Sequence, residues 1–260
     1  MTWYMPTLTV ALAACIVIAS SQSIQGADEC TSAGGYTLCQ NLAEDSGSGF
    51  VGEGQGIQMS THFRSTPSSV EWGTDYEWKV EDFTTVKSFA NVESNDAAGL
   101  RLDNLPTIAA TWNWNYSSRA ENMKSAVLFD IWLGHTPERN NGSSHEVQIW
   151  LSFTGGAKPI GERNATIYDL AEHDWELWRG TNGTTEVIIF SNPEGEDLST
   201  FNEDMGSFFE YLVDKADIPK ASCIQSIQAG TMVFGGRGTF HTSLYTLWIE
   251  YPDFEPAFPV

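Results

Sequence analysis

The chain has 260 residues and a formal net charge of −21, because 34 aspartates and glutamates outnumber 13 lysines and arginines. This negative charge disfavours nucleic acids and acidic membrane surfaces as partners, whereas a neutral polymer is compatible with it. With 41% hydrophobic residues, the length fits one large domain with a substantial core. No linker, repeat or low-complexity block divides it, and we expect a monomer.

Residues 1–26 carry no charged side chain, and the apolar run at residues 5–20 is too short to span a membrane comfortably. Small and polar residues follow the run, as they do in a secretory signal peptide. We therefore expect a signal peptide over residues 1–26 and a secreted, extracellular domain over residues 27–260. The alternatives are a retained anchor or a buried segment, since no basic residue precedes the run.

Three cysteines remain after that cleavage. Cys30 and Cys39 are close enough in sequence to close a small loop, which would leave Cys223 as a buried thiol. The spacing of Cys and His residues predicts no metal site, and no cofactor motif is present. Acceptor sequences for N-linked glycans, which predict a glycoprotein if the chain is exported, occur at Asn115, Asn141, Asn164 and Asn182.

Short runs of alternating apolar and polar residues predict β-strands at residues 110–116, 146–151, 186–190 and 244–250. Turn residues recur between such runs, as in a sandwich or barrel. Asn182-Gly183 separates two runs and predicts a tight hairpin. Residues 204–214 instead predict a helix, because apolar residues there recur at helical spacing: Met205, Phe208, Phe209, Leu212 and Val213. The pattern indicates an all-β protein with one helix.

Aromatic residues alternate along several of these strands. Trp112, Trp114 and Tyr116 share one face of a strand, and Trp132 and Trp150 suggest a similar set. Aromatic faces stack on the apolar faces of sugar rings, but such rows more often form the core between two sheets. Both interpretations are open at this point.

Carboxylates enter two of the apolar strands. Glu146 begins a strand and shares a face with Gln148 and Trp150, so it must lie in a cleft or be paired. Asp130 enters a similar strand. Two strand carboxylates that face one groove suit glycoside hydrolysis, although carboxylates at strand ends are more often simply exposed.

A series of segments, in order over residues 35–250, resembles glycoside hydrolase family 12, which contains secreted endo-β-1,4-glucanases and xyloglucan-specific glucanases. The segments are Tyr36 to Leu38, Asn41-Leu42, Val86 to Asn91, Trp114 to Tyr116, Phe129-Asp130, Glu146 to Leu151, Pro159 to Gly161, Gly180 to Gly183 and Gln228 to Thr231. The resemblance implies a β-jelly-roll of two antiparallel sheets with one short helix. It also implies an open cleft for a β-1,4-glucan and a retaining mechanism with two glutamates.

Matching the family's motifs assigns the site residue by residue. Glu146 takes the position of the nucleophile, and Asp130 that of the aspartate beside it. The family's acid/base glutamate corresponds to Met232. The resemblance and the strand pattern together give these candidate substrate-binding residues: Asn41, Trp114, Tyr116, Trp132, Gln148, Trp150 and Pro159.

Met232 is the largest departure from the family's pattern. A thioether neither protonates a leaving group nor deprotonates water, and such acid/base catalysis contributes roughly 10²–10⁴-fold to the rate. Gln148 replaces a methionine and Ala43 a cleft tryptophan. Two hypotheses follow: a strongly impaired endo-glucanase, or a non-catalytic protein that binds glucan or acts as a decoy for a proteinaceous glucanase inhibitor.

Overall fold

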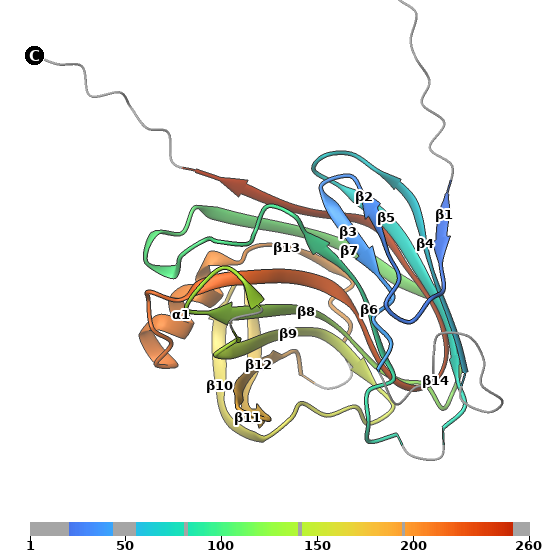
Figure 1. Cartoon of the computed structure of the whole chain (residues 1–260). Coiled ribbons are helices and arrows are strands. Elements are labelled where there is room, and N and C mark those ends of the chain that lie inside the picture. Colours follow the sequence, from blue (N-terminus) through green and yellow to red (C-terminus); the bar gives the residue numbers. More distant parts are fainter. Residues whose placement is uncertain (1–20, 44–55, 81–82, 140–141, 194–195, 252–260) are drawn as a thin grey trace, which may run out of the picture.

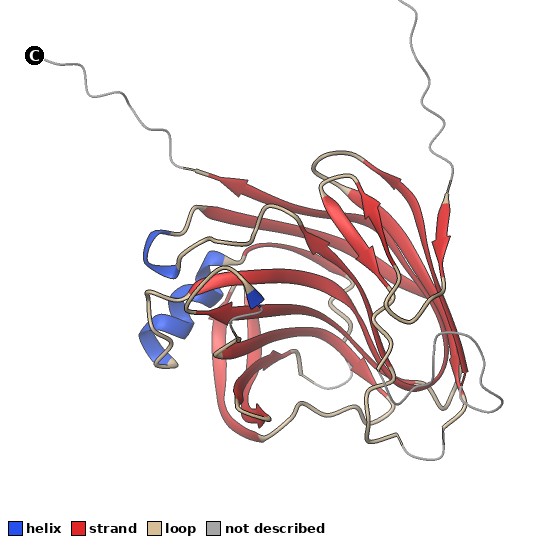
Figure 2. Ribbon diagram, viewed as in Figure 1, coloured by secondary structure: helices blue, strands red, loops and turns tan. Residues whose placement is uncertain are grey.

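The computed structural model describes residues 21–43, 56–80, 83–139, 142–193 and 196–251. Within these ranges the chain forms two curved β-sheets packed face to face, with one α-helix (Figure 1). Figure 2 shows how strands dominate the molecule. The predicted all-β jelly-roll sandwich with a single short helix is confirmed. No helix in the described part of the chain is long and apolar enough to cross a membrane.

The outer sheet contains β1 (Gln22–Ile24), β4 (Gly56–Ser65), β5 (Val70–Trp78), β7 (Thr107–Arg119), β13 (Thr200–Asp204) and the second half of β14 (Cys223–Glu250). The inner sheet contains the first half of β14 with β2 (Cys30–Ala33), β3 (Tyr36–Cys39), β6 (Ser88–Ser94), β8 (Lys124–Gly134), β9 (His145–Thr154), β10 (Glu162–Leu170), β11 (His173–Asn182) and β12 (Thr185–Ser191).

One strand pair departs from the predicted antiparallel sheets. Strands β12 and β9 pair in parallel, with Val187 beside Glu146, whereas the other pairs between the described strands are antiparallel. The hairpin β10–β11 lies between β9 and β12 in the chain, and this long connection returns β12 in the same direction as β9.

Strand β14 belongs to both sheets. Gly235 pairs with Lys124 of β8 in the inner sheet, and Gly236 pairs with Trp78 of β5 in the outer one. Gly236 has a φ of 86°, and a Cβ there would lie 2.6 Å from the Cα of Met123, so only glycine fits this corner. The corner fixes the inner half of β14, which carries Met232.

An aromatic core fills the space between the sheets. Trp72, Trp112 and Tyr245 of the outer sheet are fully buried, and Trp112 meets Phe129 of the inner sheet at 5.1 Å between ring centroids. The indole N–H of Trp112 donates to Thr242 Oγ1 at 2.9 Å, so the only polar atom of this ring is satisfied.

Helix α1 (Gly206–Lys215) confirms the predicted helix, although it begins two residues later and ends one residue later than the pattern indicated. Phe208 packs edge-on against Trp175 of β11 at 5.4 Å and against Phe190 of β12 at 5.2 Å. The Asp204 carboxylate accepts the backbone N–H of Gly206 at the start of the helix. A short 3₁₀ turn at Leu102–Asn104 precedes β7.

Two local predictions are confirmed. Asn182-Gly183 connects β11 and β12 as a tight hairpin, in which Gly183 has a φ of 63°. Cys30 and Cys39 form a disulfide between β2 and β3, and Cys223 is a buried free thiol.

One strand lies on the N-terminal side of the predicted domain boundary. Strand β1 lies within the predicted signal peptide, pairs with β4, and buries Ile24 to 1% exposure. The side-chain amide of Gln40 donates to the carbonyl of Ile24 at 3.0 Å. Cleavage after residue 26 would remove this strand, and the boundary at residue 26 stays a prediction. Residues 1–20 lie outside the described part.

Candidate functional site

Strands β8 and β9 carry the two predicted carboxyl groups on one face of the inner sheet. In their antiparallel register Asp130 lies opposite Gln148, and Trp132 opposite Glu146. The intervening residues, such as Ile131 and Val147, are fully buried in the core. Because successive side chains of a strand point to opposite faces, the two carboxyl groups lie on the face away from the core.

A short chain of hydrogen bonds holds each carboxyl group. The amide Nε2 of Gln148 donates to Glu146 Oε1, and Gln148 Oε1 accepts the indole N–H of Trp150 at 2.7 Å. The indole N–H of Trp132 donates to Asp130 Oδ2 at 2.9 Å. These donors fix the orientation of both groups on the sheet.

The two carboxyl groups are strongly coupled. Asp130 is 4% exposed and Glu146 is 6% exposed. Burial, and next the charge of Glu146, raise the pKa of Asp130 well above its usual value. Burial also raises the pKa of Glu146, against the hydrogen bonds from Gln148 and Asn182. The pKa of Asp130 is raised further than that of Glu146, so Asp130 is the group of the pair that keeps a proton more readily.

The side chain of Glu146 lines a cavity of about 320 Å³. Its wall is mainly apolar, and Glu146 and Lys158 are the two ionisable side chains among the lining residues: Thr84, Val86, Glu146, Gln148, Trp150, Lys158, Ile160, Asn182, Val187, Ile189, Met232 and Phe234. Met232 is half-buried. In the strand register it lies between Phe89 of β6 and Ala126 of β8. Its side chain packs on an apolar cluster that includes Phe234.

Asp130 lines a second cavity, of about 310 Å³. Its other lining residues include Asn41, Asn91, Trp132, Arg139 and Gln228. The guanidinium of Arg139 lies over the Trp132 ring, 4.3 Å from its centroid, so one face of that ring is already covered. Since Asp130 and Glu146 lie on adjacent strands and on the same face of the sheet, the two cavities adjoin at the carboxyl pair.

Most sequence-predicted site residues come together here. Glu146, Gln148, Trp150 and Met232 line the first cavity, and Asn41, Asp130 and Trp132 line the second. Pro159 is buried, while its neighbours Lys158 and Ile160 line the first cavity.

Trp114 and Tyr116 are not in the site, and their prediction as substrate-binding residues is wrong. They lie on β7 of the outer sheet, and Trp114 is 4% exposed within the core. Its indole N–H donates to the carbonyl of Leu198 at 3.1 Å. The Tyr116 hydroxyl bonds to Tyr76 and Ser125. The alternating pattern correctly predicted that Trp114 and Tyr116 share one face of their strand, but that face points into the core between the two sheets.

Several polar site residues were not predicted as such. Asn182 lines the cavity with Glu146, and its signal in the sequence was the Asn-Gly hairpin. Gln228 stands within one of the family-like segments, and its amide donates to Glu93 at 2.6 Å. Lys158 and Arg139 lie outside regular strands, where no periodic pattern marks them.

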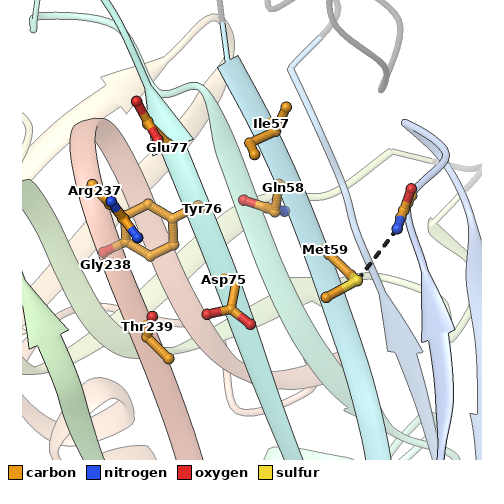
Figure 3. Close-up of a pocket in the computed structure, with 10 residues that line it drawn as sticks. Ile57, Gln58, Met59, Asp75, Tyr76, Glu77, Arg237, Gly238 and Thr239 are labelled. Atoms are coloured by element: carbon orange, nitrogen blue, oxygen red, sulfur yellow. Dashed lines mark hydrogen bonds between the residues drawn. The ribbon is translucent and has the colours of Figure 1, made fainter.

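A further concavity, of about 270 Å³, lies on the outer sheet (Figure 3). Ile57, Glu77 and Arg237 form one row across its strands, and Met59, Asp75 and Thr239 form the next. Glu77 is partly exposed and pairs with Lys79 at 3.3 Å. None of the sequence-predicted site residues lines this surface.

Comparisons with known proteins agree with this arrangement. The family model for glycosyl hydrolase family 12 matches residues 34–250. Xyloglucan-specific endo-beta-1,4-glucanase A of Aspergillus niger is 30% identical over 252 residues, covering 93% of this chain and 99% of that protein. Two solved structures have TM-scores of 0.78: endoglucanase 3 of Trichoderma harzianum is 26% identical and covers 89% of this chain and 99% of its own. A catalytic domain from Humicola grisea, in complex with a soaked thio cellotetraose, is 27% identical and covers 87% and 99%.

Proposed function

Since this chain belongs to glycosyl hydrolase family 12, we propose that its cleft takes β-1,4-glucans and that its hydrolysis of these polymers is strongly impaired. Xyloglucan is the first polymer to test, because the similar Aspergillus niger protein is named as specific for it. The dispersed negative charge is compatible with an uncharged polysaccharide. We further propose that the protein is exported, as its first residues predict.

Met232 is the observation that carries this proposal. It lines the same cavity as Glu146, at the position where the family's pattern has a glutamate. A retaining glycosidase needs a proton donor for the leaving alkoxide and later a base for the attacking water. A thioether has no proton to give and is a negligible base. The missing group is expected to cost roughly 10²–10⁴-fold in rate.

Asp130 is poorly placed to take over this role. It lies on the strand next to Glu146, diagonal to it in the register, and the two carboxyl groups interact electrostatically. The two catalytic carboxyl groups of retaining enzymes are about 5–5.5 Å apart, with the glycosidic oxygen between them. Asp130 lies beside the nucleophile on the same sheet and lines the second cavity, whereas Met232 shares the first cavity with Glu146. Asp130 instead supports the negative charge of Glu146.

The test is hydrolysis of polymeric xyloglucan by the wild type and by Met232→Glu. We expect barely detectable reducing ends from the wild type and a gain of at least about 10²-fold in the variant, since a carboxyl group restores acid/base catalysis. Adding Glu146→Gln to the variant should abolish the gain. Family-level turnover by the wild type would overturn the proposal.

Binding without turnover is the second candidate function. It is favoured by the retained cleft residues around an acid/base position that holds Met232. Affinity electrophoresis in gels containing xyloglucan separates this candidate from a protein-partner role. Retardation that persists in Glu146→Gln supports glucan binding, whereas no retardation on any β-glucan leaves a decoy for a glucanase inhibitor.

A further inference from the structure

Glu146 keeps the features of a nucleophile. Its carboxylate lines the cavity, and the Gln148 amide donates to Oε1. Donors of this kind stabilise an ionised carboxylate that is otherwise largely buried. The chain therefore holds the group that attacks the anomeric carbon of a sugar in place, with its charge and orientation set.

The group that would activate water is missing from the same cavity. Apart from Glu146, the described lining residues include neither a carboxylate nor a histidine. The other polar groups there include the amides of Gln148 and Asn182, and much of the wall is apolar, including Met232 and Phe234. Water bound against such a wall has no base to take its proton, so its attack on a glycosyl ester is slow.

Esterification of Glu146 would change the charge of the cavity lining from balanced to positive, because Lys158 is the other ionisable side chain there. Before reaction the ammonium of Lys158 and the carboxylate of Glu146 balance each other among the lining residues. Once Glu146 is esterified, its negative charge is gone and Lys158 remains. Lys158 is exposed to solvent, so its ammonium attracts a small anion modestly, and less at high salt.

From these three observations we propose a further activity: this protein transfers a glycosyl group from an activated β-glucoside to a small anionic nucleophile, through an ester on Glu146 that otherwise accumulates. This inference rests on the proposed function, because it requires a cleft that binds β-1,4-linked sugars. It differs from hydrolysis of the polymer because the donor carries a good leaving group and the acceptor is an anion instead of water.

The chemistry balances without an acid or a base. In the first step a carboxylate oxygen of Glu146 bonds to the anomeric carbon, and an aryl oxide of low basicity leaves with the bonding electron pair. In the second step the anion bonds to the same carbon, and the Glu146 carboxylate leaves with its electron pair. Two displacements give a β-glycosyl product from a β-glycoside.

The experiment uses the full chain, 2,4-dinitrophenyl β-cellobioside as donor and azide as acceptor. Without azide, we expect a burst of dinitrophenolate equal to the protein concentration, and intact-mass spectrometry should detect the cellobiosyl ester. With azide, steady turnover should rise by at least about tenfold, a part of the 10²–10⁴-fold that the missing base costs. The product should be β-cellobiosyl azide.

Matched variants locate the activity. Glu146→Gln should show neither burst nor ester. Met232→Glu should release free cellobiose at a rate that azide hardly changes. Lys158→Gln should modestly raise the azide concentration that gives half the maximal effect. Lys220→Gln should leave it unchanged, because Lys220 is exposed like Lys158 but does not line the cavity.

Failure of this inference is distinct from failure of the proposed function. If the wild type forms no ester and shows no response to azide, while Met232→Glu hydrolyses xyloglucan, the transfer activity is refuted and the impaired hydrolase stands. If the wild type hydrolyses xyloglucan as efficiently as Met232→Glu, both are refuted.

Discussion

Two residues that line the cavity with Glu146 differ in chemical type from the residues in the family's pattern. Position 148 carries an amide where a methionine is expected, and position 232 carries a methionine where a glutamate is expected. Gln148 donates directly to Glu146, whereas Met232 joins an apolar cluster. The cavity thus supports a fixed carboxylate but offers it no acid/base partner.

Replacing Gln148 by methionine tests how this carboxylate is held. The hydrogen bond from Gln148 lowers the pKa of Glu146 against the effect of burial, so its loss should raise that pKa further. The acidic limb of the pH profile for the dinitrophenolate burst should therefore move to higher pH in Gln148→Met. Gln228→Met is the control, because Gln228 donates to Glu93 on the same sheet. An unmoved limb would mean that Gln148 does not stabilise the ionised carboxylate.

The raised pKa of Asp130 predicts that the stability of the folded protein depends on pH. Its pKa is raised in the folded protein, so above about pH 4 the folded state keeps a proton that the unfolded state releases. Raising the pH therefore favours unfolding. The amide introduced by Asp130→Asn does not titrate, so the unfolding free energy of this variant should gain on the wild type as pH rises, by at most about 1.4 kcal/mol per pH unit. Urea unfolding from pH 4 to pH 7 measures the difference, and a constant difference would contradict the assignment.

For individual residues, the sequence predicted which side chains share a face of a strand, but not which face of the strand packs in the core. The shared face of Glu146, Gln148 and Trp150 was predicted correctly, because a lone carboxylate cannot lie in an apolar core. Trp114 offered no such clue, since an aromatic row suits a cleft and a core equally. Which of the two it lines depends on the sheet to which its strand belongs.

Among the elements, β1 decides where the folded domain begins. It adds Ile24 to the core and gives the Gln40 amide one of its two carbonyl acceptors, the other being that of Gln58. The apolar pattern at the N-terminus did not reveal this strand, because three residues are too few for a periodic signal.

A chain that starts at Ala27 should therefore be less stable than one that starts at Ser21. Burying Ile24 alone contributes about 1.5–3 kcal/mol, and the unpaired Gln40 donor adds to the loss. Denaturant midpoints of the two purified chains give the comparison. Equal midpoints would show that β1 does not belong to the cooperative unit.

Elements with local signals were predicted well, and those defined by long-range pairing were not. Helix α1 and the Asn182-Gly183 hairpin follow from spacing and turn chemistry within a few residues. The parallel pairing of β12 with β9 joins segments about forty residues apart, and period-two alternation is the same for both strand directions.

At the scale of the whole molecule, the strongly negative net charge contrasts with the cleft, where two cationic side chains lie. The chain carries −21 overall, yet Arg139 and Lys158 line the two cavities that adjoin at the carboxyl pair. A neutral glucan is neither attracted nor repelled by the surface charge, while a small anion meets two exposed cations beside the carboxyl groups of the cleft. The family resemblance was available from ordered motifs, but these two cations became visible only when the fold brought the strands and loops together.

The central claim is that the cleft retains its nucleophile and lacks a proton donor. The most direct measurement is the rate of aryl oxide release from a series of aryl β-cellobiosides whose phenols differ in pKa. Without a donor, the wild-type rate should fall steeply as the phenol becomes more basic, and in Met232→Glu the dependence should flatten. A shallow dependence in the wild type, equal to that of the variant, would show that another group protonates the leaving oxygen.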